Sequence, residues 1–133
     1  MLLKYYLITK REGHAVATIM LCDDASFMRM TLLKIVEPAG HKVIGQAENG
    51  VEAIKLYKEL KPEIVLMDIT MPEVDGIEAT KKIKEYDPDA KVIMVSAMGQ
   101  MVKVCEAIDA GAKDFVVKPF DPDKILQCID KIL

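Results

Sequence analysis

Short apolar runs alternate with amphipathic stretches from Ala17 to the end of this chain. The runs have the length of strands, whereas the stretches between them repeat apolar residues at helical spacing. This pattern predicts strands over residues 18–22, 42–47, 63–68, 91–97 and 114–118, and helices over residues 26–37, 50–60, 77–86, 100–110 and from 122 onward.

The five predicted strands and five predicted helices alternate strictly, which favours an α/β fold built on a parallel sheet. The strand runs are almost continuously apolar, as expected when helices cover both faces of the sheet. In open sheets of this class, ligands bind beyond the carboxyl ends of the strands. We therefore expect the chemistry at the residues that end each strand.

Polar or charged residues stand at or just after every predicted strand end. Because parallel strands end at one edge of a sheet, we expect carboxylates, a hydroxyl and an ammonium group to converge there. These residues are Asp23 and Asp24, Glu48, Asp68, Ser96 and Lys118.

Three of these residues, Asp23, Asp24 and Asp68, bring negative charges close together. Like charges raise one another's pKa, and a bound divalent cation removes this conflict. Oxygen ligands without His or Cys favour Mg²⁺, which takes one or two carboxylates together with a substrate phosphate. An ionised Asp68 suits nucleophilic attack on phosphorus. Ser96 and Lys118 are of the right type to stabilise a phosphoryl group on it.

The composition argues against several other classes of protein. The chain has 133 residues, which suits one domain, and a net charge of −3, which does not suit non-specific binding to nucleic acid or to an anionic membrane. No apolar run approaches the roughly 20 residues that span a bilayer, so we expect no membrane insertion. Residues 1–13 lack the features of a signal peptide, which favours the cytoplasm. Cys22, Cys105 and Cys128 are odd in number and far apart, and we expect buried, reduced thiols.

The strand-end residues also lie within a recognisable set of motifs. The chain resembles the receiver domains of two-component response regulators, and most closely the single-domain chemotaxis regulators of the CheY-like type. The resemblance covers about residues 17–133 and implies a flavodoxin-like, doubly wound (βα)5 fold with strand order 2-1-3-4-5. The stretches that carry it are CDDASFMRM (22–30), AENGVEA (47–53), MDITMPEVDGIEA (67–79), VSAMGQ (95–100) and AGAKDFVVKPF (110–120).

The resemblance implies a role for each matching residue. Asp68 is the phosphoacceptor, and Lys118 forms an ion pair with the phosphoryl group. Ser96 and Phe115 are the switch residues, and the Lys118–Pro119 peptide bond is cis. The metal is Mg²⁺, with Mn²⁺ as a substitute, and its ligands are Asp23, Asp24, Asp68 and the backbone carbonyl of Thr70.

Three positions depart from the most familiar family pattern. Phe115 replaces a frequent tyrosine, so that its inward movement gains packing but no hydrogen bond. Thr70 and Met98 occupy positions that tune the lifetime of the phosphoryl group in the family. Neither residue offers an amide or a carboxylate to orient a water molecule.

The function implied by the resemblance is that of a cytoplasmic signalling switch. A CheA-like histidine kinase phosphorylates Asp68, and a downstream protein such as a flagellar motor switch protein receives the signal. The chain is then no enzyme beyond its own phosphotransfer and autodephosphorylation.

Alternative functions remain open at this stage. A phosphorelay intermediate or an isolated receiver from a multidomain transcription regulator shares the same motifs. An Mg²⁺-dependent aspartate-nucleophile phosphatase belongs to another class, and its DxDx[TV] signature requires a second acid two residues after the nucleophile. Thr70 occupies that position here, which argues against a phosphatase.

A few expectations concern residues away from the strand ends. We expect residues 1–16 to form an extension that is partly disordered or was introduced by cloning, although residues 4–9 have strand propensity. We expect Met30 and Met94 in the core, Arg29 in solvent and His41 at the surface.

Overall fold

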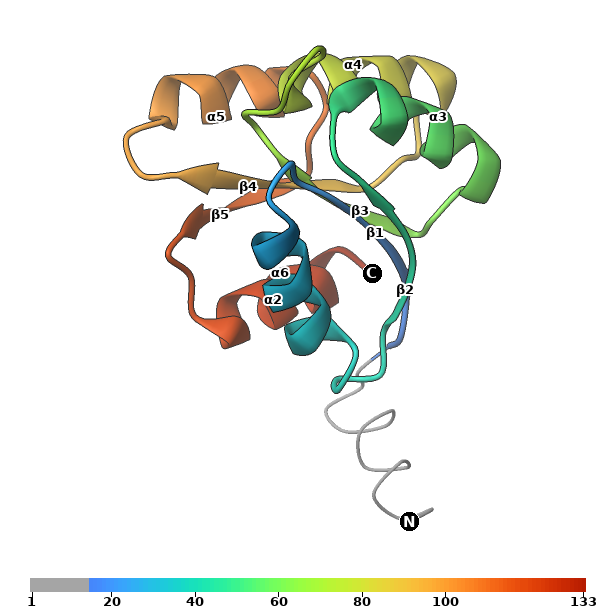
Figure 1. The fold of residues 1–133 in the computed structure, drawn as a ribbon, viewed down its shortest axis with the longest axis vertical. Helices are drawn as coiled ribbons and strands as arrows, with labels where there is room; N and C mark the ends of the chain where they lie inside the picture. Colours follow the sequence, from blue (N-terminus) through green and yellow to red (C-terminus); the bar gives the residue numbers. More distant parts are fainter. Residues whose placement is uncertain (1–14) are drawn as a thin grey trace.

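The computed structural model describes residues 15–133, which form a five-stranded parallel sheet in the order β2-β1-β3-β4-β5 (Figure 1). This order confirms the predicted flavodoxin-like fold, and the predicted bounds differ from the observed ones by one residue at most. Residues 1–14 of the expected extension, including the segment 4–9 with its strand propensity, lie outside the described residues. The elements are β1 (Thr18–Cys22), α2 (Ser26–Val36), β2 (Lys42–Ala47), α3 (Gly50–Leu60), β3 (Ile64–Asp68), α4 (Gly76–Tyr86), β4 (Val92–Ala97), α5 (Met101–Asp109), β5 (Asp114–Lys118) and α6 (Pro122–Ile132).

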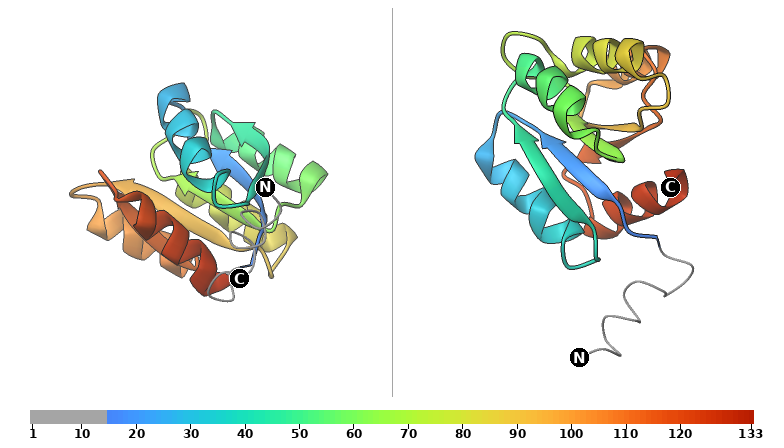
Figure 2. Two further views of the ribbon diagram at one scale, coloured as in Figure 1. Left: turned by 90° about the horizontal axis from the view of Figure 1, so that it is seen from below. Right: turned by 90° about the vertical axis from the view of Figure 1, so that its right-hand side faces the viewer.

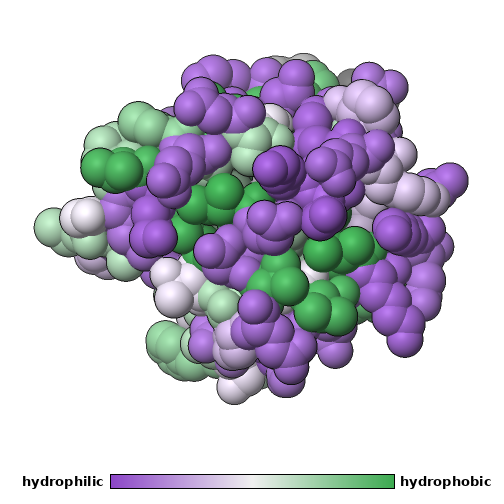
Figure 3. Space-filling view, turned by 90° about the horizontal axis from the view of Figure 1, so that it is seen from above, coloured by the Kyte–Doolittle hydropathy of each residue, from purple (hydrophilic) through white to green (hydrophobic). Residues whose placement is uncertain are grey.

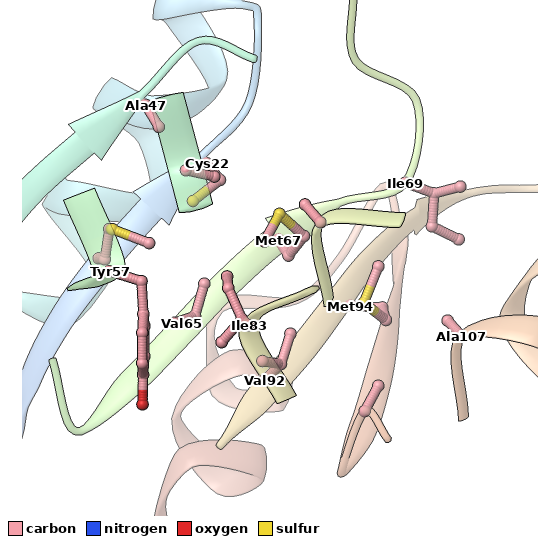
Figure 4. Packing of buried hydrophobic residues seen from close by; sticks show 14 of the residues in the cluster. Cys22, Ala47, Tyr57, Val65, Met67, Ile69, Ile83, Val92, Met94 and Ala107 are labelled. Carbon is pink, nitrogen blue, oxygen red and sulfur yellow. The ribbon is translucent and has the colours of Figure 1, made fainter. Parts of the chain in front are cut away.

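Helices cover both faces of the sheet. Helices α3, α4 and α5 lie on one face and α2 and α6 on the other, as Figures 1 and 2 show. Successive side chains of a strand point to opposite faces, which divides the buried residues of β1 and β3 between two cores. Met67 packs toward α3, α4 and α5 together with Tyr57 and Ile83 (Figure 4). Leu66, its neighbour in sequence, packs toward α2 and α6.

Side-chain caps mark where three of the helices begin. Asn49 accepts a hydrogen bond from the backbone N–H of Glu52 at the start of α3, and Asp75 accepts one from Glu78 at the start of α4. Asp121 caps α6, with Pro122 at the first helical position. Each cap contributes about 1 kcal/mol and orients its helix relative to the preceding strand.

The buried side of α2 differs from the predicted one. Arg29 is 8% exposed, whereas Met30 is 53% exposed, so both predictions for these residues are wrong. The buried residues of α2 are Arg29, Leu32 and Val36. The helix is therefore rotated by one residue from the phase that hydrophobicity alone favours, because the guanidinium of Arg29 finds buried acceptors.

Two other side chains are placed differently from expectation. His41 is buried, not at the surface, and its Nδ1 accepts a hydrogen bond from the backbone N–H of Ala17 at 3.0 Å. Cys22 and Cys128 are buried as predicted, but Cys105 is exposed on α5. Burial raises the pKa of the Cys22 thiol, and burial raises that of Cys128 to about 12.

Hydrophobic side chains also reach the surface near the start of α5. Met94 is buried as predicted, whereas Met98, Met101 and Val102 are largely exposed. The surface over α3, α4 and α5 is mainly hydrophilic, with hydrophobic side chains gathered in a few patches (Figure 3). None of the helices within residues 15–133 is long and apolar enough to cross a membrane.

Candidate functional site

Three carboxylates meet at the carboxyl edge of the sheet. Strands β1 and β3 are neighbours in register, with Cys22 opposite Met67, so that Asp23 and Asp68 end their strands at the same level. Asp23, Asp24 and Asp68 each offer an oxygen atom, and these atoms lie within 4.8 Å of one another. Asp23 and Asp68 are buried and Asp24 is exposed, so that the cluster opens to solvent on one side.

Lys118 joins this cluster from β5, two strands away from β3. Its Nζ lies 3.1 Å from Asp23 Oδ2 and 3.5 Å from Asp68 Oδ1. The side chain of Lys118 is only 23% exposed, so these ion pairs are weakly screened by solvent. The Lys118–Pro119 peptide bond, which the resemblance implies to be cis, is cis in the structure.

Ser96 is the next-to-last residue of β4, the strand between β3 and β5. Its side chain is fully buried, and its Oγ has no hydrogen-bond partner among residues 15–133. A buried hydroxyl without a partner is unfavourable by about 1–3 kcal/mol, and such groups often mark functional positions. Ser96 comes one residue after Val95, which pairs with Asp68 of β3.

The electrostatics of Asp68 follow from its surroundings. Burial and, second, the charge of Asp23 raise the pKa of the Asp68 carboxyl from 3.8 to about 6. The Lys118 ammonium and the backbone N–H of Thr70, which donates to this carboxylate, oppose that rise. The cluster therefore retains excess negative charge, and a hard divalent cation with oxygen preference fits it.

The loop that carries Asp23 is held by Arg29, which the sequence interpretation placed in solvent. The Arg29 guanidinium donates to the backbone carbonyl of Asp23 at 2.6 Å and to Gln46 Oε1 at 3.0 Å. It also pairs with Glu48 at 3.4 Å, and Asp23 Oδ1 accepts from the backbone N–H of Ala25. Glu48, a predicted strand-end residue, thus lies in this network rather than among the three carboxylates.

Gly76 brings α4 into close contact with the end of β3. A Cβ atom on Gly76 would lie 1.9 Å from the backbone carbonyl oxygen of Asp68, so no other residue fits at this position. The backbone N–H of Gly76 donates to the carbonyl of Ile69 at 2.7 Å, which closes the loop after Asp68. Thr70 lies in this loop with an exposed side chain.

Phe115, the predicted aromatic switch residue, is half-buried. It lies on β5 opposite Met94 of β4 and packs against the core under α3, α4 and α5. Its ring therefore belongs to the face of the sheet that α5 covers.

The comparisons with known proteins agree with this geometry. Residues 19–130 match the response regulator receiver domain family. The chain belongs to this family. The recognition drawn from the sequence motifs is therefore confirmed, and the protein is a response regulator that acts as a signalling switch rather than as an enzyme with its own substrate.

Curated relatives of this receiver domain are similar in length as well as in sequence. It is 56% identical to the chemotaxis protein CheY of Thermotoga maritima and 54% identical to that of Bacillus subtilis. Each match covers 86% of this chain, and the matches cover 95% of the Thermotoga protein and 96% of the Bacillus protein.

Among solved structures, the receiver domain is similar to a CheY in a crystal structure of the CheX-CheY-BeF3-Mg+2 complex from Borrelia burgdorferi. The TM-score is 0.83 at 38% identity, over 86% of this chain and 87% of the other. Receiver domains bind Mg²⁺ through an acidic pocket, and Asp23, Asp24 and Asp68 form such a pocket here.

Proposed function

We propose that Asp68 accepts a phosphoryl group from a histidine kinase in an Mg²⁺-dependent reaction in the cytoplasm, and that the phosphorylated protein signals in chemotaxis. The observation that carries this proposal is the convergence of three carboxylates with Lys118 and the unpartnered Ser96 hydroxyl around one buried nucleophile. The choice of chemotaxis rests on the names of the most similar relatives. Residues 17–133 act as the receiver domain and residues 1–16 as an extension.

The metal ligands in this proposal are Asp23, Asp24, Asp68 and the backbone carbonyl of Thr70, and Mn²⁺ can substitute for Mg²⁺. The ion neutralises the carboxylates and polarises the phosphoryl group when it is bound. Asp23 is held for this role by Ala25 and Arg29, which fix its side chain and its backbone.

The chain's own residues account for the transfer. A carboxylate oxygen of Asp68 forms a bond to phosphorus, and the bond between phosphorus and the donor breaks with its electron pair on the leaving group. Lys118 pairs with the added negative charge. Ser96 donates its hydroxyl proton in a hydrogen bond to a phosphoryl oxygen, which satisfies a group that has no partner beforehand.

The signal then passes to protein contacts. When the Ser96 hydroxyl moves toward the phosphoryl group, Phe115 moves further inward, and the surface formed by α5, β5 and α6 changes its affinity for a target. The kinase in this proposal is CheA-like, and the target is a flagellar motor switch protein. Autodephosphorylation of Asp68 ends the signal.

Intact-mass measurement tests the site directly. The protein is incubated with acetyl phosphate and Mg²⁺, and the expected product is one phosphoryl adduct that is absent in Asp68→Asn and absent with EDTA. Slow release of phosphate in step with loss of the adduct supports a switch, whereas sustained turnover of acetyl phosphate supports a phosphatase. An adduct that persists in Asp68→Asn contradicts the assignment of Asp68.

A further inference from the structure

The side chain of Gln100 bridges two loops at the carboxyl edge of the sheet. Its Oε1 accepts a hydrogen bond from the backbone N–H of Ala97 at 2.7 Å, and its Nε2 donates to Thr70 Oγ1 at 3.0 Å. A backbone N–H can only donate, so the first contact fixes which end of the amide is oxygen. Gln100 is partly buried, and it lies 30 residues from Thr70 in sequence.

Both contacts of Gln100 adjoin residues of the candidate site. Thr70 donates its backbone N–H to the Asp68 carboxylate, and Ala97 directly follows Ser96. The Gln100 amide therefore ties the loop after β3 to the loop after β4. These two loops flank the nucleophile and the switch hydroxyl.

The contact with Ala97 bears on the movement of Ser96. The Ser96 hydroxyl has no partner in this conformation, and a phosphoryl group on Asp68 would provide one. Ser96 cannot move far without Ala97, and displacement of Ala97 breaks its 2.7 Å hydrogen bond to Gln100. Nothing lies within 4 Å of a Cβ built on Gly99, which has φ +83°, so no packing holds the loop on that side of Gly99.

We propose that Gln100 is a positioning residue that latches the β4–α5 loop in its unphosphorylated position and thereby sets the phosphoryl affinity and lifetime of the switch. The inference rests on the proposed function of Asp68 and Ser96. In the unphosphorylated protein the Gln100 carbonyl oxygen occupies the Ala97 N–H. After phosphorylation the movement of Ser96 draws Ala97 away from the Gln100 carbonyl oxygen, and the Thr70 contact is released with it.

The latch makes a prediction for a stable phosphoryl analogue. Because the latch opposes the phosphorylated conformation, Gln100→Ala is expected to bind beryllofluoride with Mg²⁺ roughly two- to tenfold more tightly, which is the range for loss of one or two exposed hydrogen bonds. It is expected to release a phosphoryl group more slowly by a similar factor. Val102→Ala, an exposed change in the first turn of α5, is the matched control and is expected to leave both values unchanged.

Thr70→Val provides an independent route to the same contact. It removes the hydroxyl that anchors the amide and keeps the backbone carbonyl of residue 70. The expected effect has the same direction as that of Gln100→Ala and is smaller, and it disappears when Gln100→Ala is already present, because the two side chains act through one contact. Additive effects of the two changes would overturn the proposal.

Amide hydrogen exchange tests the latch without any phosphoryl group. In the unphosphorylated protein, Gln100→Ala is expected to speed exchange of the Ala97 N–H roughly two- to tenfold and to leave the N–H groups of residues 92–96 in β4 unchanged. Unchanged exchange at Ala97, or unchanged beryllofluoride affinity, overturns the latch. If the wild-type chain takes no phosphoryl group while Ala97 exchange still responds, the proposed function has failed rather than the contact.

Discussion

The raised pKa of Asp68 predicts that this residue destabilises the metal-free protein. At pH 8 the carboxyl is ionised although burial and Asp23 oppose its charge. A carboxyl whose pKa is raised from 3.8 to about 6 destabilises the folded chain by up to about 3 kcal/mol once it is ionised. Asp68→Asn removes this charge with little change in shape, and Lys118 keeps its ion pair with Asp23. We expect a gain of about 1–3 kcal/mol in the free energy of unfolding at pH 8.

The pH dependence of the stability difference between Asp68→Asn and the wild type shows whether the charge of Asp68 causes that difference. The folded wild-type chain holds the Asp68 proton more tightly than the unfolded chain, so its stability falls as the pH rises from 3.8 to about 6. The Asp68→Asn variant has no such proton. The difference between the two proteins should therefore be largest above pH 6 and close to zero below pH 3.8.

Urea unfolding followed by circular dichroism, with EDTA present, measures this difference at a series of pH values. Added Mg²⁺ should stabilise the wild-type protein more than the variant, because the ion binds the folded acidic cluster. If Asp68→Asn were less stable than the wild type at pH 8, or if its gain did not change with pH, the reasoning about burial and charge would be refuted.

Three further changes test other parts of the structure. Arg29→Met should lower the free energy of unfolding by about 1–3 kcal/mol, because it leaves the Asp23 carbonyl and Gln46 without their buried donor. It should also weaken Mg²⁺ binding measured by calorimetry. Unchanged Mg²⁺ affinity would restrict Arg29 to a structural role. Gly76→Ala should lower the free energy of unfolding by about 3 kcal/mol or prevent folding, because the added Cβ meets the Asp68 carbonyl. The matched Gly99→Ala should lower the free energy of unfolding by only about 1 kcal/mol, because Gly99 has a positive φ and open space around it. Met67→Ala should lower it by about 2–5 kcal/mol by leaving a cavity under α3 and α4, and a loss below 1 kcal/mol in urea unfolding would contradict the packing in that core.

Much of the fold and the candidate site follows from sequence periodicity. The apolar runs are short and nearly continuous, so strands and helices are easy to separate. Parallel strands end at one edge, which predicts that Asp23 and Asp68 lie at that edge, and the pairing of β1 with β3 makes them neighbours. The placement at the edge depends on local pattern and on strand direction alone, whereas the strand order came from the family resemblance.

The residues that sequence interpretation misplaced depend on distant partners instead. Arg29 is buried because Gln46 and Glu48, 17 and 19 residues away, provide acceptors, and hydrophobicity alone ranks Met30 above it as a core residue. His41 is buried because the backbone of Ala17 donates to its ring. Gln100, to which sequence interpretation assigned no role, owes its contact to Thr70, which the order of the strands brings close. In each case, polar complementarity across the fold outweighs local hydrophobicity.

The unequal exposure of the three cysteines provides a natural reporter position. A thiol-reactive dye at neutral pH should modify Cys105 in the folded protein and leave Cys22 and Cys128 unmodified, because both are buried and burial raises their pKa. Cys105 lies little more than one helical turn beyond Gln100 in the chain. A fluorophore attached to Cys105 would follow movement at the start of α5 without any substitution in the chain. Its signal would record the opening and closing of the β4–α5 loop in real time.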